Sequence, residues 1–187
     1  MPYPPPRTVI ASDDEIKKLF TQAKPWMRLW LTLTAGHGLR FAEAHRLAPT
    51  HYNAQSNTIT YRVKGNQTNT LPVSDDLKKF LDSIPPDTDP NTPLVEIAAG
   101  RPMTRHNIYE HWERLKKHAG VNRFLRTHDL RRTLAVKVYD LTHDLRAVQH
   151  TLGHGRLATT CLYLEHHDPE KIRPILNQLR PKPSWSN

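Results

Sequence analysis

Residues 127–141 have the sequence THDLRRTLAVKVYDL, which carries the spacing of an amphipathic helix. Its apolar side chains recur at intervals of three and four residues and so share one face: Leu130, Leu134, Val138 and Leu141. Thr127 is of a residue type that caps helix N-termini, so we expect it to cap this helix. His128 and Arg131 stand three residues apart and share a face, where an imidazole and a guanidinium can converge on one anion.

Helical spacing continues on both sides of this segment. Ser12 and Glu15 match a capping box that opens a helix, and Pro25 suits the first turn of the next one. Two faces are expected to be core: Met27, Trp30, Leu31 and Thr34 on the second helix, and Ile108, Trp112, Leu115 and Ala119 on a later one. Further helices are expected over residues 39–48, 75–84, 104–119, 144–152, 157–164 and 169–179.

A β-hairpin interrupts the helices. Residues 57–63 are rich in Thr, Ile, Tyr and Val, residues 64–66 (Lys-Gly-Asn) are a turn signal, and residues 69–73 supply the returning strand. Residues 85–93 contain four prolines without periodicity, which predicts a surface loop. The pattern is that of a mainly α chain with a small antiparallel β-sheet, an α+β arrangement.

Charge points to a polyanionic partner. The 187 residues suit a single domain, and their formal net charge of +9 with a pI near 9.8 favours nucleic acid. Residues 101–132 alone hold nine Lys and Arg against three acids, interleaved with Tyr109 and Trp112. A solvated helix surface is one interpretation of this charge run; we favour a surface that tracks phosphates.

Several classes of protein and site are excluded at this point. No apolar run approaches the roughly 20 residues of a membrane span, and residues 1–7 lack the features of a secretory signal, so a cytoplasmic protein without membrane contact is expected. The single cysteine, Cys161, cannot form an internal disulfide and is given no catalytic role. His150 and His154 have a metal-ligand spacing but no evident third ligand, so no metal site is predicted. The tryptophans are expected to be core: Trp26, Trp30 and Trp112.

Three short clusters hold the residue types that carry chemistry. They are GLRFAE at 38–43, HDLR at 128–131, and LGH at 152–154, the last followed nine residues later by Tyr163. Each has an ordinary explanation by itself. Arg40 and Glu43 can form a surface ion pair of little energetic value, and Tyr163 can be a buried core residue.

Taken together with Lys64 in the hairpin turn, the order and spacing of these clusters resemble the catalytic domain of tyrosine recombinases, the phage integrase and Xer group. The resemblance extends from about Ser12 to Leu179 and implies a mainly helical domain with a small antiparallel sheet, in agreement with the pattern above. Two features depart from the family. His37 stands where a small or hydroxyl residue is common before the glycine, and the turn around Lys64 is less basic than usual.

The resemblance assigns a role to each residue in the cleavage of a phosphodiester. Arg40 and Arg131 would stabilise the charge on the phosphate, as two bidentate guanidiniums can. The other catalytic assignments are His154 as a further phosphate donor, His128 as phosphate donor or acceptor of the tyrosine proton, Lys64 as proton donor to the departing 5′-oxygen, and Tyr163 as nucleophile. Glu43 and Asp129 would orient Arg40 and the helix that carries His128. The product is a 3′-phosphotyrosyl bond, formed without ATP, metal or other cofactor.

The resemblance also implies an organisation and a setting. We expect an extended arm over residues 1–11, a catalytic domain over 12–179 and a loose tail over 180–187, with no N-terminal core-binding domain. The expected partner is double-stranded DNA, on which the protein self-associates as dimer to tetramer while being monomeric when free. The expected location is the cytoplasm of a bacterium, with a bacterial, phage or mobile-element origin.

The expected function is site-specific DNA recombination of the integrase or invertase type. A type IB topoisomerase uses the same pocket to relax supercoils, and a non-catalytic DNA-binding regulator can retain the fold, so both stay open as alternatives. A generic basic helical domain with accidental motif matches is the third. The sequence carries no information on the DNA target, because phosphate contacts do not read bases.

Overall fold

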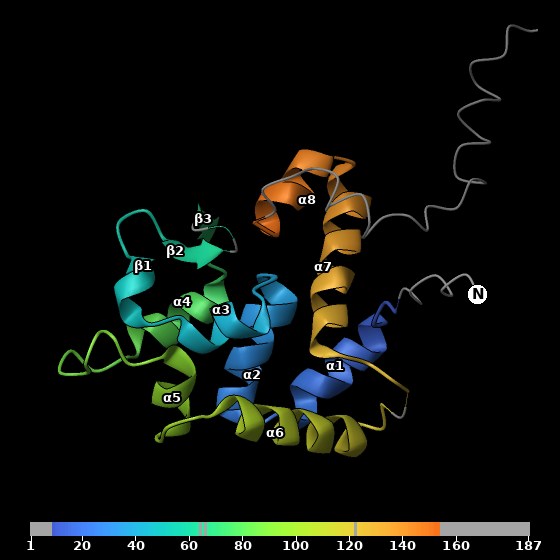
Figure 1. Cartoon of the computed structure of the whole chain (residues 1–187), viewed down its shortest axis with the longest axis horizontal. Coiled ribbons are helices and arrows are strands. Elements are labelled where there is room, and N and C mark those ends of the chain that lie inside the picture. The colour runs from blue at the N-terminus through green and yellow to red at the C-terminus, as the bar shows by residue number, and fades with distance from the viewer. Residues whose placement is uncertain (1–8, 64, 66, 122, 154–187) are drawn as a thin grey trace, which may run out of the picture.

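The computed structural model describes residues 9–63, 65, 67–121 and 123–153, which form a mainly helical body with one small sheet (Figure 1). The α+β prediction is therefore confirmed. Several predictions lie outside the described residues: Lys64, His154, Tyr163, Cys161, most of the N-terminal arm, the C-terminal tail, and the helices expected over 157–164 and 169–179.

The helices follow the predicted spacing closely. In chain order they are α1 (Asp13–Gln22), α2 (Pro25–Leu31), α3 (Phe41–Arg46), α4 (Asp75–Asp82), α5 (Leu94–Ala99), α6 (Arg105–His118), α7 (Thr127–Thr142) and α8 (Leu145–Thr151). The capping box of α1 is present, since Ser12 Oγ accepts from the Glu15 amide at 3.2 Å and Glu15 Oε2 accepts from the Ser12 amide at 2.8 Å. Within the described ranges, no helix combines the length and apolar character needed to cross a bilayer.

Besides the 3-10 turn Pro49–His51, two helical segments were not predicted. Helix α5 follows the proline-rich loop, and its six residues are too few to display a period, although Leu94 and Val95 are fully buried. Helix α2 does not stop before the glycine turn but widens into a π-helical turn, Thr32–Gly36. A wider turn of this kind is common at functional sites and brings the chain to Gly38.

The sheet contains three antiparallel strands in the order β1 (Tyr52–Asn53), β2 (Thr58–Val63) and β3 (Gln67–Pro72). Strands β2 and β3 are the predicted hairpin. The two-residue strand β1 was missed because it is shorter than any recognisable alternation. Along β2 every second side chain is buried, so Tyr61 faces the core and Arg62 faces solvent.

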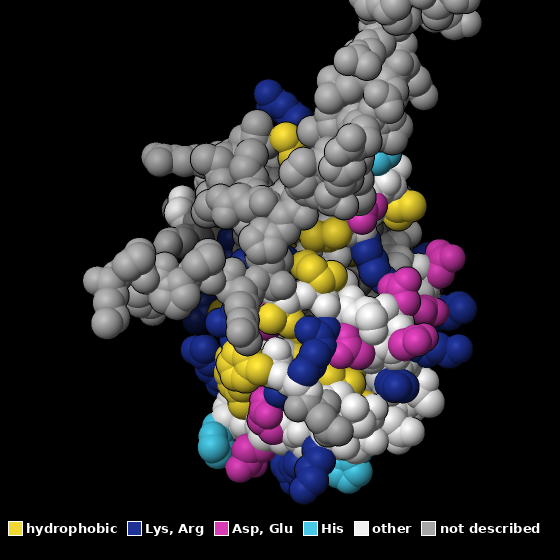
Figure 2. Space-filling model, turned by 90° about the vertical axis from the view of Figure 1, so that its right-hand side faces the viewer, with side chains coloured by type: hydrophobic (Ala, Val, Ile, Leu, Met, Phe, Trp, Pro, Cys, Tyr) yellow, Lys and Arg dark blue, Asp and Glu magenta, His cyan; other side chains and the backbone are white. Residues whose placement is uncertain are grey.

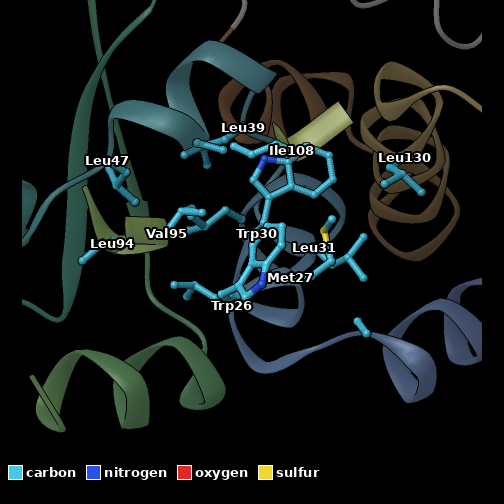
Figure 3. Packing of buried hydrophobic residues seen from close by; sticks show 14 of the residues in the cluster. Trp26, Met27, Trp30, Leu31, Leu39, Leu47, Leu94, Val95, Ile108 and Leu130 are labelled. Carbon is cyan, nitrogen blue, oxygen red and sulfur yellow. The ribbon is translucent and has the colours of Figure 1, made fainter. Parts of the chain in front are cut away.

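The core is centred on Trp30, which is surrounded by side chains from α2, α5, α6 and α7 (Figure 3). Its ring lies 5.7 Å from Phe41 and 6.1 Å from Trp112, between ring centroids. Trp26, Trp30 and Trp112 are all buried, so the prediction that they are core residues is confirmed.

Helix α7 differs from its prediction at both ends. Thr127 does not cap it; the last residue before the helix is Arg126, whose amide donates to Asp129 Oδ2 at 2.8 Å. A carboxylate in this position also interacts favourably with the positive end of the helix dipole. At the other end Leu141 is 85% exposed, so the expected apolar stripe does not extend to it. Asp129, Leu130 and Arg131 near the start of the helix are buried, while Leu141 at its C-terminal end lies outside the core.

Several basic side chains in the stretch over residues 101–132 form ion pairs with acidic side chains. Five of its nine basic side chains pair with acids: Arg114 with Glu110, Lys116 with Glu113, Arg123 with Glu15, Arg126 with Asp129 and Arg131 with Glu43. On the side of the molecule that carries α1 and α7, Figure 2 shows acidic and basic side chains next to one another. These ion pairs neutralise part of the positive charge of the basic stretch.

The pairing of Arg123 with Glu15 joins the connection before α7 to the first turn of α1. Arg123 donates to both carboxylate oxygens at 2.6 Å and to the Ile10 carbonyl at 2.6 Å. Close by, the Ala11 amide donates to Thr133 Oγ1 at 2.8 Å. These contacts attach residues 10–15 to the α7 region.

Replacement of Glu15 by Gln is expected to remove the ion pair while keeping an oxygen for the Ser12 amide. The bond from Arg123 lowers the pKa of Glu15 from 4.5 to about 2. Since the folded-state pKa is the lower one, the carboxylate stabilises the fold above pH 4.5 and loses that effect as the pH falls toward 2. Chemical denaturation should find the variant less stable at pH 7 by about 1 kcal/mol or less, with the gap narrowing below pH 4.5. A gap independent of pH would contradict this assignment.

Candidate active site

The guanidinium of Arg131, in the HDLR cluster, forms hydrogen bonds with the other two predicted clusters. Nη1 donates to the carbonyl of Gly38 and Nη2 donates to the carbonyl of Leu152, and the residue is only 1% exposed. The segments GLRFAE, HDLR and LGH, far apart in the sequence, therefore meet around one side chain. His154 follows this junction directly but lies outside the described residues.

Arg40 lies next to this junction, as the residue that caps α3. The carboxylate of Glu43 accepts from the Arg40 amide at 2.7 Å and from Arg40 Nη1 at 2.7 Å. The second oxygen of Glu43 also lies 3.8 Å from Arg131 Nη1. The Glu43 side chain is 8% exposed against 31% for Arg40. This is a buried bridge between two guanidiniums rather than a weak surface ion pair.

His128 and Asp129 lie in the first turn of α7. Asp129 is fully buried, and its carboxylate fixes the start of the helix through the Arg126 amide. Desolvation, together with the charges of Arg131 and Arg132, lowers the pKa of His128 below its usual value. The lowered pKa favours the neutral form of the imidazole, which is the form that acts as a proton acceptor.

A cleft of about 600 Å³ opens beside Arg40, between α3 and the outer face of the hairpin. Its wall includes Arg40, Glu43, Arg46, Tyr61 and Arg62. Arg46 and Arg62 are exposed, and neither forms a hydrogen bond or ion pair with the described residues. The cleft therefore presents uncompensated positive charge beside the paired guanidiniums.

Tyr61 and Asn69 were not predicted as site residues. Asn69 Nδ2 donates to Tyr61 Oη at 3.2 Å, and burial raises the pKa of the Tyr61 hydroxyl above its ordinary value. The alternation of β2 predicts that Tyr61 is buried. No sequence signal places it beside Arg40 and Glu43, because that contact depends on how the hairpin packs on α3.

Residues 11–170 match the phage integrase family over most of the chain. The chain belongs to the phage integrase family. Within this family it is similar to tyrosine recombinase XerC of Actinobacillus succinogenes, with 33% identity over 163 residues that cover 83% of this chain and 54% of the relative. The chain thus spans about half the length of the curated relatives it matches.

Solved structures agree with this membership of the phage integrase family. The crystal structure of XerA recombinase superimposes with a TM-score of 0.71 at 26% identity, covering 96% of this chain and 68% of the other. The XerH site-specific recombinase, in a post-cleavage complex with its palindromic difH substrate, gives a TM-score of 0.69 at 22% identity, with coverage of 91% and 53%. The second likeness concerns the fold alone.

His37, the departure from the family pattern, has a structural role. Its Nδ1 donates to the Thr32 carbonyl at 2.9 Å, and its Nε2 accepts from the Ser74 amide at 3.2 Å. Burial lowers the pKa of His37, which favours the neutral ring that these two bonds require. The histidine thereby fastens the π-helical turn to the start of α4, immediately before Gly38.

Replacement of Arg131 by Lys is expected to destabilise the domain even though the charge is kept. One ammonium cannot reach carbonyls on both the Gly38 and Leu152 segments, and an unsatisfied buried carbonyl is costly. We expect the free energy of unfolding to fall by about 2–4 kcal/mol in urea titrations. The control is Arg126→Lys, at a guanidinium that is 54% exposed, where the change should stay below about 1 kcal/mol. Equal stability of both variants would contradict the bridging role of Arg131.

Proposed function

We propose that this chain is a site-specific DNA recombinase of the integrase or invertase type that cleaves and rejoins double-stranded DNA through a 3′-phosphotyrosyl intermediate. The observation that carries the proposal is the pair of guanidiniums, Arg40 and Arg131, bridged by the buried carboxylate of Glu43. The relatives' names support the reaction class, since they are tyrosine recombinases.

The arginine pair suits a phosphodiester in its transition state. Attack at phosphorus raises the negative charge on the two non-bridging oxygens, and planar guanidiniums can bind both oxygens with charge-assisted hydrogen bonds. Glu43 holds Arg40 at the edge of the cleft, so little reorganisation is needed when the phosphate arrives. Asp129 orients the helix start that presents Arg131 and His128.

The remaining assignments complete the proton balance. A tyrosine hydroxyl has an unperturbed pKa of about 10, so Tyr163 needs a base or a cationic pocket to act as a nucleophile. The neutral imidazole of His128 would accept its proton while a bond forms between the phenolic oxygen and phosphorus. Lys64 would donate a proton to the 5′-oxygen as its bond to phosphorus breaks, and His154 would add a hydrogen bond to the phosphate. The reverse reaction rejoins DNA without ATP, because the phosphotyrosyl bond retains the energy of the phosphodiester.

We place neighbouring DNA phosphates in the cleft beside Arg40. The solvent-facing side chains of the hairpin there are Thr60, Arg62 and Thr68, which can all donate to phosphate oxygens. Arg46 of α3 lies on the opposite wall. Together they extend the phosphate-binding surface away from the reacting centre.

We further propose that protomers associate on DNA as dimer to tetramer, and that the reaction takes place in the cytoplasm of a bacterial cell. Exchange of strands between two duplexes needs four strand cleavages, and each protomer supplies one proposed nucleophile, Tyr163. A recombinase that acts through one nucleophile per chain therefore needs several protomers.

Covalent chemistry is tested with a duplex that carries a bridging 5′-phosphorothiolate, incubated with the wild-type protein and with Tyr163→Phe. We expect an adduct that resists denaturation, absent from the variant, and mapped by mass spectrometry to Tyr163. Intact DNA binding without an adduct would favour a binding protein. An adduct with supercoil relaxation but no recombinant product would favour a type IB topoisomerase.

The DNA path is tested by the salt dependence of binding. Each lost phosphate contact should reduce the slope of log K against log salt by about 1. We expect this change for Arg46→Gln and for Arg62→Gln, and no change for Arg114→Gln on α6. The opposite result would place DNA on the basic stretch over residues 101–132 and contradict the path through the cleft.

A further inference from the structure

Asn69 is a buried polar side chain in the middle of a strand. It lies on β3, directly opposite Tyr61 on β2, and is 8% exposed. Its neighbours Thr68 and Thr70 face solvent, so Asn69 occupies a position on the inward face where an apolar residue such as Leu71 is usual. A buried amide is costly unless it is hydrogen-bonded, so its partners indicate what it contributes.

The amide group of Asn69 connects the hairpin to α8. Nδ2 donates to the backbone carbonyl of His150 at 3.0 Å and to Tyr61 Oη at 3.2 Å. Asn69 thereby connects the sheet to the C-terminal end of α8.

Close packing at Gly153 reinforces the same junction. A Cβ atom at Gly153 would lie 2.9 Å from Val63 Cγ1 and 3.1 Å from Asn69 Nδ2, which leaves no room for a side chain. Val63 is the residue before Lys64, and Gly153 is the residue before His154. The junction thus joins the chain segments that lead directly to two proposed catalytic residues.

The two sides of this junction are anchored differently. The α8 side is fixed to the buried Arg131, which donates to the Leu152 carbonyl. On the hairpin side, Val63 and Gln67 are the last paired residues, and Lys64 follows Val63 in the sequence. Loss of the Asn69 bonds would therefore release the hairpin end rather than the phosphate-binding arginine.

We propose that Asn69 is a positioning residue for the leaving-group proton donor: by holding the hairpin against α8, it fixes Lys64 relative to the phosphate bound by Arg131. The proposal rests on the proposed recombinase function. It assigns Asn69 no contact with DNA and predicts a defect in one step, protonation of the departing 5′-oxygen.

The test compares two DNA substrates that differ in one atom. With a bridging 5′-sulfur the leaving group is a thiolate, which departs without a proton because a thiol pKa is about 8.5, far below that of an alcohol. Asn69→Leu, which keeps the branching at Cγ but removes the hydrogen-bonding groups, should slow cleavage of the oxygen substrate by about ten- to a hundredfold, and the sulfur substrate by less than about threefold. DNA affinity should be unchanged.

Lys64→Ala should give the same pattern, and adding Asn69→Leu to it should slow the oxygen substrate no further. Thr70→Val is the matched control on the same strand. It removes the bond between the Thr60 and Thr70 hydroxyls on the solvent face, and both substrates should be cleaved at the wild-type rate. A cooperative melting transition for Asn69→Leu, or for Asn69→Ala if the first variant fails to fold, establishes that the fold persists.

Equal slowing of both substrates by the Asn69 variants, or no slowing of either, would overturn the positioning role. So would additive effects with Lys64→Ala. These outcomes are distinct from failure of the proposed function, in which the wild-type protein forms no adduct with the sulfur substrate.

Discussion

Arg131 carries a positive charge into the interior of the domain, and the surrounding chain compensates that charge at three points. The carbonyls of Gly38 and Leu152 accept its hydrogen bonds, and the carboxylate of Glu43 lies 3.8 Å away. A buried charge without such partners would cost several kcal/mol. The three segments must therefore come together for α7 to bury Arg131, so assembly of the site and folding of the domain are coupled.

This constraint explains the backbone around the site. Gly38 and Gly153 both have positive φ, at 69° and 55°, and each presents its segment to the arginine junction where a Cβ would be crowded. The π-helical turn leads into Gly38, and the bond from the Ser74 amide to His37 holds this segment in place. The hairpin contacts the segment before Gly153 through the bond from Asn69 to the His150 carbonyl. The charge of Arg131 is compensated inside the domain, whereas the charges of Arg46 and Arg62 at the cleft are not compensated by any described residue, which is why we propose that DNA phosphates bind there.

The sequence predicts those parts of the structure that depend on local spacing. The capping box at Ser12, the stripes of α2 and α6, the hairpin and the proximity of Arg40 to Glu43 all follow from periods and residue types. Helix α5 and strand β1 are too short to show a period. The sequence suggests Thr127 as the cap of α7, but the helix begins one residue earlier because the buried carboxylate of Asp129 accepts from the Arg126 amide. The bonds of Asn69 and Arg131 join residues 81 and 93 positions apart, which no local pattern encodes. A residue that departs from local sequence rules, such as a buried asparagine on a strand, marks a position where tertiary contacts determine the structure.

The most direct measurement for the central claim is an experimental structure of Tyr163→Phe bound to a duplex. The account predicts that the guanidiniums of Arg40 and Arg131 both lie within hydrogen-bonding distance of the non-bridging oxygens of one phosphate, while Arg131 still holds the Gly38 and Leu152 carbonyls. A phosphate bound elsewhere, or an Arg131 that remains out of reach of it, would show that the buried arginine serves the fold alone.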